Sequence, residues 1–221
     1  IINGDAAYFR IPLYLDPIPC DEYLYQVLWA NTMSTPGSLL VKFNPFTNQR
    51  DTLGSVGNYR VNAAGYYQNT QLIYAYDGNN NTFIAIGNNA KHIGFKFAVN
   101  PTASLNKGDI DVNGKYYLRQ SFANNQQTTY YCYDVNPKSP TYLRLVNPAN
   151  NFAAINTPIQ RAATNNADFA IHPTNQKHYG IYALNNVGYL SIYDPITNVI
   201  SNHALTGSLA TTSSGFGGAF F

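Results

Sequence analysis

Apolar and polar residues alternate along this chain in short runs, and four of those runs begin with small or acidic residues. The four leading segments are residues 62–67, 108–112, 167–173 and 217–221. A two-residue period is typical of a half-buried β-strand. The leading segments recur at intervals of roughly 45 to 60 residues, which is the usual length of one four-stranded propeller blade. The pattern therefore predicts an all-β chain built from repeated blades.

Each of the first three leading segments is followed by two more predicted strands. Tyrosine-bearing second strands are expected at 72–76, 115–118 and 178–182, and third strands at 82–86, 129–135 and 188–193. The intervening turns are rich in Asn, Gly, Pro and Thr, which favour turn geometry, and β-branched and aromatic residues fill the strands. Almost no helix is predicted.

The two ends of the chain each contain part of a blade. Residues 22–28 and 37–45 have the pattern of a second and a third strand, with no leading strand before them unless residues 5–9 supply it. The last leading segment, 217–221, has no strands after it. We therefore predict a β-propeller-like ring of four blades, or of five if residues 5–9 begin their own blade. The N- and C-terminal strands, or a neighbouring subunit, would close the ring, because proteins usually cover an open sheet edge.

We expect residues 1–221 to form a single domain, with residues 1–20 as an N-terminal arm.

Charged residues make up only 11% of the chain, whereas it contains 19 Tyr and 29 Asn. Its formal charge of +2 and the absence of a Lys/Arg run exclude a nucleic-acid-binding stripe. No apolar run approaches the roughly 20 residues of a membrane span. The chain begins at Ile1 and not at Met, from which we expect a processed, secreted protein.

Several segments, in this order and spacing, carry a resemblance to a known family. They are residues 53–57, 62–66, 107–111, 114–117, 167–173, 179–181 and 215–221. On these segments the stretch from Ser38 to Phe221 resembles a group of secreted propeller-like repeat domains catalogued as a domain of unknown function. The resemblance implies a secreted or cell-surface protein, often adhesive or structural, without an established enzyme activity.

Motifs for metal binding and catalysis are sparse. Asp109, Asp111 and Asn113, followed by Gly114, match the opening of a calcium loop and are weak metal candidates. The position that should carry a closing Glu is Gln120. We therefore expect a strand and a turn that need no ion, and we predict no cofactor and no catalytic residue. The four histidines have no zinc-site spacing. His172 and His178 bracket a turn and could meet across a hairpin, but we expect ordinary turn histidines.

The two cysteines and one sequon are candidates for covalent modification. Cys20 and Cys132 can form at most one internal disulfide, and two buried free thiols are the alternative. Asn80, in the sequence Asn80-Asn81-Thr82, is the candidate N-glycosylation site.

Consecutive tyrosines offer one ring to each face of their strands. The clusters are 66–67, 116–117 and 130–133. Most of these rings should belong to the core, but we expect some to point outward and to contact a partner.

Two functions agree with these observations. The first is an extracellular structural protein that assembles head to tail with copies of itself into a fibre or surface layer, through strand exchange by its terminal segments. The residues predicted to carry assembly are Tyr8, Phe9, Ile11, Leu13, Phe216, Phe220 and Phe221. The alternative is a secreted, adhesin-like binding module for glycans or proteins. An enzyme is not expected.

Overall fold

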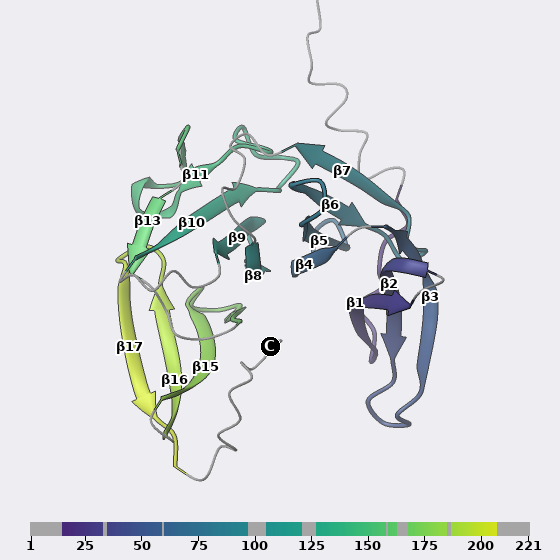
Figure 1. Cartoon of the computed structure of the whole chain (residues 1–221). Helices are drawn as coiled ribbons and strands as arrows, with labels where there is room; N and C mark the ends of the chain where they lie inside the picture. Colours follow the sequence, from purple (N-terminus) through teal and green to yellow (C-terminus); the bar gives the residue numbers. More distant parts are fainter. Residues whose placement is uncertain are drawn as a thin grey trace, which may run out of the picture.

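The described residues form four larger antiparallel sheets that follow one another along an arc, and one two-stranded hairpin (Figure 1). The computed structural model describes residues 15–32, 35–58, 60–96, 105–120, 127–157, 159–162, 168–184 and 187–206. These residues contain no α-helix, and thus no helix that could cross a membrane. The predicted all-β, propeller-like class is confirmed, and the sheets do not close into a ring.

We call the sheets blades 1 to 4 in chain order. Blade 1 contains β1 (Leu24–Thr32), β2 (Thr35–Phe43) and β3 (Arg50–Gly57). Blade 2 contains β4 (Val61–Tyr67), β5 (Leu72–Asp77), β6 (Thr82–Ile86) and β7 (His92–Lys96). Blade 3 contains β8 (Leu105–Ile110), β9 (Lys115–Gln120), β10 (Gln127–Asp134) and β13 (Ile159–Ala162). Blade 4 contains β14 (Ala170–Ile171), β15 (His178–Leu184), β16 (Val187–Asp194) and β17 (Val199–Ala204). A small hairpin of β11 (Val146–Asn147) and β12 (Ala153–Ala154), with the 3-10 turn Pro148–Asn150 between them, leads from β10 to β13.

Blades 2 to 4 begin with the predicted leading strands, which lie next to one another. The strand β8 contacts both β4 and β14, and the labels β4 and β8 lie on the inner side of the arc in Figure 1. Consecutive strands of a blade then pair in order toward the rim. The leading strands therefore form the inner layer of the arc.

One form of turn recurs at several connections between neighbouring strands. Asn44 before β3 and Asp194 before β17 each accept hydrogen bonds from the backbone N–H groups two and three residues later. Both turns close on an Asn with left-handed backbone geometry, Asn48 at φ 60° and Asn198 at φ 58°, a conformation that Asn tolerates. The turn between β14 and β15 has the same form, since His172 accepts the N–H groups of Thr174 and Asn175 and Gln176 has φ 59°. Among the described residues, blade 1 contains three strands, whereas each of the other blades contains four.

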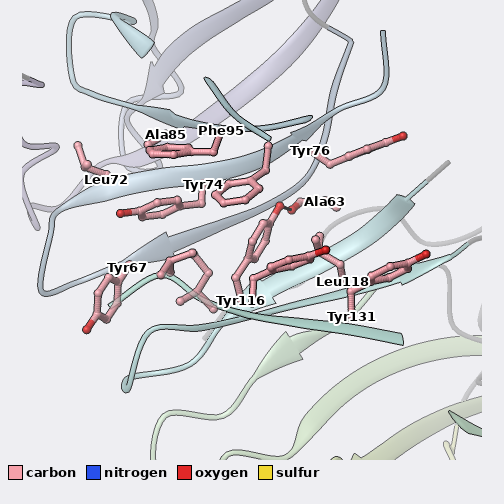
Figure 2. Close-up of a cluster of buried hydrophobic side chains, with 14 of the residues drawn as sticks. Ala63, Tyr67, Leu72, Tyr74, Tyr76, Ala85, Phe95, Tyr116, Leu118 and Tyr131 are labelled. Carbon is pink, nitrogen blue, oxygen red and sulfur yellow. Dashed lines mark hydrogen bonds between the residues drawn. The ribbon is translucent and has the colours of Figure 1, made fainter. Parts of the chain in front are cut away.

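The core consists of three apolar clusters, one at each junction between neighbouring blades. Alternate residues of β5 and β6 point to opposite junctions: Ile73 and Ile84 pack toward blade 1, whereas Tyr74 and Phe83 pack toward blade 3. Figure 2 shows the side chains from blades 2 and 3 that meet at the second of these junctions. Both faces of blades 2 and 3 are therefore covered, which is why β5 and β6 are almost entirely buried.

The described part of the predicted arm packs on blade 2 of the same chain. Ile18, only 1% exposed, donates its backbone N–H to the Gln71 carbonyl at 2.7 Å, and its carbonyl accepts from the Tyr66 hydroxyl at 3.0 Å. Leu15 is also buried. All seven residues predicted to carry assembly lie outside the described residues.

Candidate functional site: blade junctions and end faces

The inner strands approach each other so closely that two positions have no room for a side chain. A Cβ on Gly108 of β8 would lie 2.7 Å from the Ala63 carbonyl oxygen of β4, and one on Gly65 would lie 2.8 Å from the Ile110 backbone nitrogen. The Tyr116 hydroxyl also donates to the Ala63 carbonyl at 2.5 Å. Glycine is thus required at positions 65 and 108 by the direct contact between the β4 and β8 backbones.

In or just before each leading strand, one side-chain oxygen bonds to the backbone of the next residue. Asn62, Asp109 and Asp168 each accept, through Oδ1, the backbone N–H of the next residue at 2.8–2.9 Å. Asp109 also accepts the Ile171 N–H of the next blade through Oδ2, at 2.8 Å. Asp109 therefore ties blade 3 to blade 4.

The two calcium-loop aspartates are both used by the protein backbone. The Asp111 carboxylate accepts the backbone N–H groups of Asn113 and Lys115 at 2.9 and 2.8 Å and the Tyr117 hydroxyl at 3.3 Å. Asn113 is exposed in the turn. Within the described ranges, no three His, Cys, Asp or Glu side chains are grouped to hold a metal ion. The strand-and-turn interpretation accounts for these hydrogen bonds.

Burial makes Asp109 a pH-sensitive junction residue. Desolvation raises its pKa to about 7, and the nearby charges of Asp168 and Asp111 act in the same direction. Because the folded pKa lies above the unfolded one, this group stabilises the fold fully below about pH 4, and its contribution is lost as the pH rises through about 7. We expect the difference in unfolding free energy between the wild type and Asp109→Asn to fall across that range. Urea unfolding from pH 4 to 8 measures it, and a pH-independent difference contradicts the assignment.

Blade 3 is tied to blade 4 at a second place, by a buried arginine among aromatic rings. Arg119 of β9 is 1% exposed, and its guanidinium carbon lies 4.0 Å from the ring centre of Tyr193 and 5.2–5.3 Å from those of Tyr130 and Phe169. The His178 ring stacks on Phe169 at 4.6 Å. Burial, and then the charge of Arg119, hold the pKa of His178 well below its ordinary value, so the ring is neutral.

Sequence reasoning missed this cluster, because it placed His178 at the start of the strand 178–182 and treated it as an ordinary histidine beside a turn. His172 does lie in a turn, where its Nδ1 accepts the backbone N–H of Thr174 at 3.2 Å. His178 pairs with Ile171 in the sheet and is buried. The signal that could have found it is its place in strand alternation, two residues before Gly180 and four before the buried Tyr182.

The expectation that some clustered tyrosines point outward is wrong for the second and third clusters. Tyr116, Tyr117, Tyr130, Tyr131 and Tyr133 are at most 1% exposed. They do alternate between the two faces of blade 3, as expected, but a neighbouring blade covers each face. In the first cluster, Tyr67 is buried and Tyr66 half-buried.

Blade 4 ends the arc with an apolar face that no described residue covers. The face that packs on blade 3 carries His178, Tyr193 and every second residue from them along β15 and β16. The opposite face presents Ile181, Leu190, Ile192 and Val199, as the pairing of β15, β16 and β17 requires. Ile181 is 38% and Val199 57% exposed, and all four lie outside the three core clusters. We call this surface the blade 4 end face.

Blade 1 has a matching surface at the other end of the arc. Its covered face, with Val27 and Leu40, packs on blade 2. The opposite face carries Leu24, Leu28 and Phe43, which are half-buried, and Val41, which is buried. None of the four belongs to the three core clusters. We call it the blade 1 end face. In Figure 1 the two terminal blades lie on either side of the opening of the arc.

The sequence did contain a signal for the blade 4 end face. In β15 and β16 apolar residues occupy both phases of the two-residue period, which is typical of a strand covered on two sides. We read these strands only as members of a blade.

The predicted disulfide is absent, and both cysteines are free thiols. Cys132 is buried on the blade 3 face that packs on blade 4. Cys20 is exposed just before β1, so the alternative of two buried thiols is correct only for Cys132. Asn80 is exposed in the turn after β5, and its Nδ2 donates to Asp77 Oδ2 at 2.7 Å. Its glycosylation stays a prediction.

Comparison with known proteins bears on the fold alone. No protein-family model matches the chain, and no curated protein was found to match it. A structure of a protein of unknown function from Bacteroides thetaiotaomicron is 11% identical, with a TM-score of 0.51, and the match covers 91% of this chain and 51% of that one.

Two further solved structures have lower scores. TolB from Acinetobacter baumannii is 12% identical with a TM-score of 0.46, and the match covers 87% of this chain and 54% of TolB. A streptogramin B lyase is 11% identical with a TM-score of 0.47, and the match covers 88% of this chain and 69% of the lyase. The chain spans about half the length of the Bacteroides protein and of TolB. Its structural neighbours are β-propellers, and the chain has a propeller-like all-β fold.

Proposed function

We propose that this protein is an extracellular structural subunit that assembles head to tail with copies of itself. The observation that carries the proposal is the pair of apolar end faces at opposite ends of the arc. Sheet faces of this kind are buried at each of the three junctions within the chain. In position, the blade 4 end face corresponds to the faces that pack on the following blade, and the blade 1 end face corresponds to the faces that pack on the preceding blade.

A second copy of this chain carries a suitable packing partner for each of the two end faces. At each internal junction, the face of one blade that points toward the next blade in the chain packs on the face of that next blade. The blade 4 end face and the blade 1 end face are two such faces, so the same contact can form between blade 4 of one copy and blade 1 of another. Such a contact uses two different surfaces, and therefore it can be repeated without closing. The low charge of the chain adds little repulsion between copies.

The alternative of a glycan-binding or protein-binding module has lost part of its support. It depended on outward tyrosines, and five tyrosines of blade 3 are buried between neighbouring blades. Secretion is part of the proposal and is supported by the low-charge, Asn-rich composition.

The test changes the blade 4 end face. We expect the wild type to form assemblies of more than two copies that grow with concentration, and Ile181→Lys/Leu190→Lys to remain monomeric, because two desolvated charges would oppose the contact. Light scattering after size exclusion, with electron microscopy, measures both. Ile196→Lys is the matched control, since Ile196 is 55% exposed but lies in the turn after β16. A wild type that stays monomeric at high concentration refutes the proposal.

A further inference from the structure

Blade 3 contains a buried ion pair that joins the start of one strand to the end of the next. Lys115 begins β9, Asp134 ends β10, and the two residues lie directly opposite each other in the sheet. Lys115 Nζ is 2.5 Å from Asp134 Oδ2, and the two side chains are 10% and 0% exposed. This distance is below the roughly 2.7–2.9 Å of an ordinary charge-assisted N–H···O bond. The amine is therefore held against the carboxyl group in a site that excludes most water.

The backbone fixes both partners of the pair in this position. The Lys115 N–H donates to Asp111 Oδ1 at 2.8 Å, and the Lys115 carbonyl accepts the Asp111 N–H at 3.0 Å. On the other strand, the Asp134 N–H donates to the Arg144 carbonyl at 3.0 Å, and the Asp134 carbonyl accepts the Leu143 N–H at 2.6 Å. Two groups that folding has already placed in contact lose little further entropy when they react.

Hydrogen-bond donors surround the Asp134 carboxyl group. Ser139 Oγ and Thr141 Oγ1 each donate to Oδ2 at 2.5 Å. The Asn136 N–H donates to Oδ1 at 3.0 Å. Donors at both oxygens stabilise the negative charge that develops on them when a nucleophile attacks the carboxyl carbon. The centre of the Phe152 ring lies 5.3 Å from Lys115 Nζ, so the amine has an apolar group beside it.

Blade 4 contains a corresponding pair in a different environment. Lys177 precedes β15 and Asp194 ends β16, next to the opposed residues His178 and Tyr193. The distance from Lys177 Nζ to Asp194 Oδ2 is 3.9 Å, and the two side chains are 44% and 23% exposed. Water solvates both charges there, so we expect an ordinary ion pair. The two pairs share a place in their blades and differ in burial and in contact distance.

We propose that Lys115 and Asp134 condense to an intramolecular amide bond after the chain has folded. The Lys115 ammonium first passes one proton to Asp134 Oδ2, because burial removes most of the solvation that favours the two charged forms. The neutral Nζ then attacks Cγ, so that a C–N bond forms and the C–O bond to Oδ2 breaks. Oδ2 leaves as water with the transferred proton and a second proton from the nitrogen. Oδ1 stays as the carbonyl oxygen of the amide.

The reaction needs only the two side chains, since the amine and the acid are both present and nothing is oxidised or reduced. The bond joins positions 19 residues apart and locks the β9–β10 hairpin, which constrains the unfolded chain as a disulfide does. It is independent of the proposed assembly, and either proposal can fail without the other.

Mass spectrometry of the full-length chain tests the proposal. The intact mass of the purified, denatured protein should lie below that of the sequence by one water molecule. Peptide mapping should then find a branched peptide in which Lys115 is joined to Asp134. A wild type with the full mass of its sequence overturns the proposal.

Two matched variants identify the source of the water loss. Lys115→Arg keeps a positive charge beside Asp134, but a guanidinium stays protonated and does not attack a carboxyl group. It should therefore have its full mass. Lys177→Arg changes the exposed pair of blade 4 and should keep the loss of one water molecule. A water loss that persists in Lys115→Arg has another source, such as the closure of an aspartate to a cyclic imide, and overturns the proposal. The branched peptide of the wild type decides the question in the same way if Lys115→Arg does not fold.

Discussion

Gly108→Ala is expected to destabilise the protein by roughly 2 to 4 kcal/mol, because one methyl group would lie within 3 Å of the β4 backbone. The nearest atom is the Ala63 carbonyl oxygen, which belongs to a strand held in its own sheet and cannot retreat alone. Relief of the contact requires blades 2 and 3 to separate at their inner edge. That separation would loosen the apolar cluster between them.

The matched control is Gly94→Ala in β7. A Cβ there meets only the Ile84 side chain, at 4.0 Å. Alanine in place of a strand glycine is otherwise neutral or favourable by up to about 1 kcal/mol. Urea unfolding followed by circular dichroism gives both free energies. Equal effects of the two substitutions would show that the inner layer is not close-packed.

Gly65→Ala should act at the same junction and not independently. Its Cβ would contact the Ile110 nitrogen of β8, across from Gly108. Once one substitution has forced the strands apart, the second meets less resistance, so the double variant should lose less than the sum of the single losses.

The inner and middle strands of each blade were predictable from the sequence because their residues alternate. Leading, second and third strands of blades 2 to 4 appear in the structure close to the predicted residues. The outer strands β7 and β17 were not identified. β17 is exposed at five of its six residues, so no buried face imposes an alternation on it.

The candidate site was less accessible to sequence reasoning, because it arises from contacts between blades. Whether a tyrosine pair in β9 has an outward ring depends on a second neighbouring sheet, which no local pattern reports. The link from Asp109 to Ile171 spans 62 positions and depends on β8 and β14 lying side by side. Asp109 was correctly placed in a strand and Asp111 at a turn, but the role of Asp109 in joining blade 3 to blade 4 was not foreseen.

Arg119→Ala is expected to cost about 3 to 5 kcal/mol, since it removes one of the largest buried side chains at the blade 3–blade 4 junction and its contacts with three rings. Arg119→Met should cost less, because it fills most of the same volume and removes the desolvation of a buried charge. Arg119→Lys should fall between them, since ammonium keeps the charge but cannot stack as a plane on Tyr193. Arg144→Ala, at an exposed position, is the control and should stay within about 0.5 kcal/mol. Thermal and urea unfolding give this order directly. A methionine variant as unstable as the alanine variant would mean that the charge itself, and not the packing around it, holds blade 4 on blade 3.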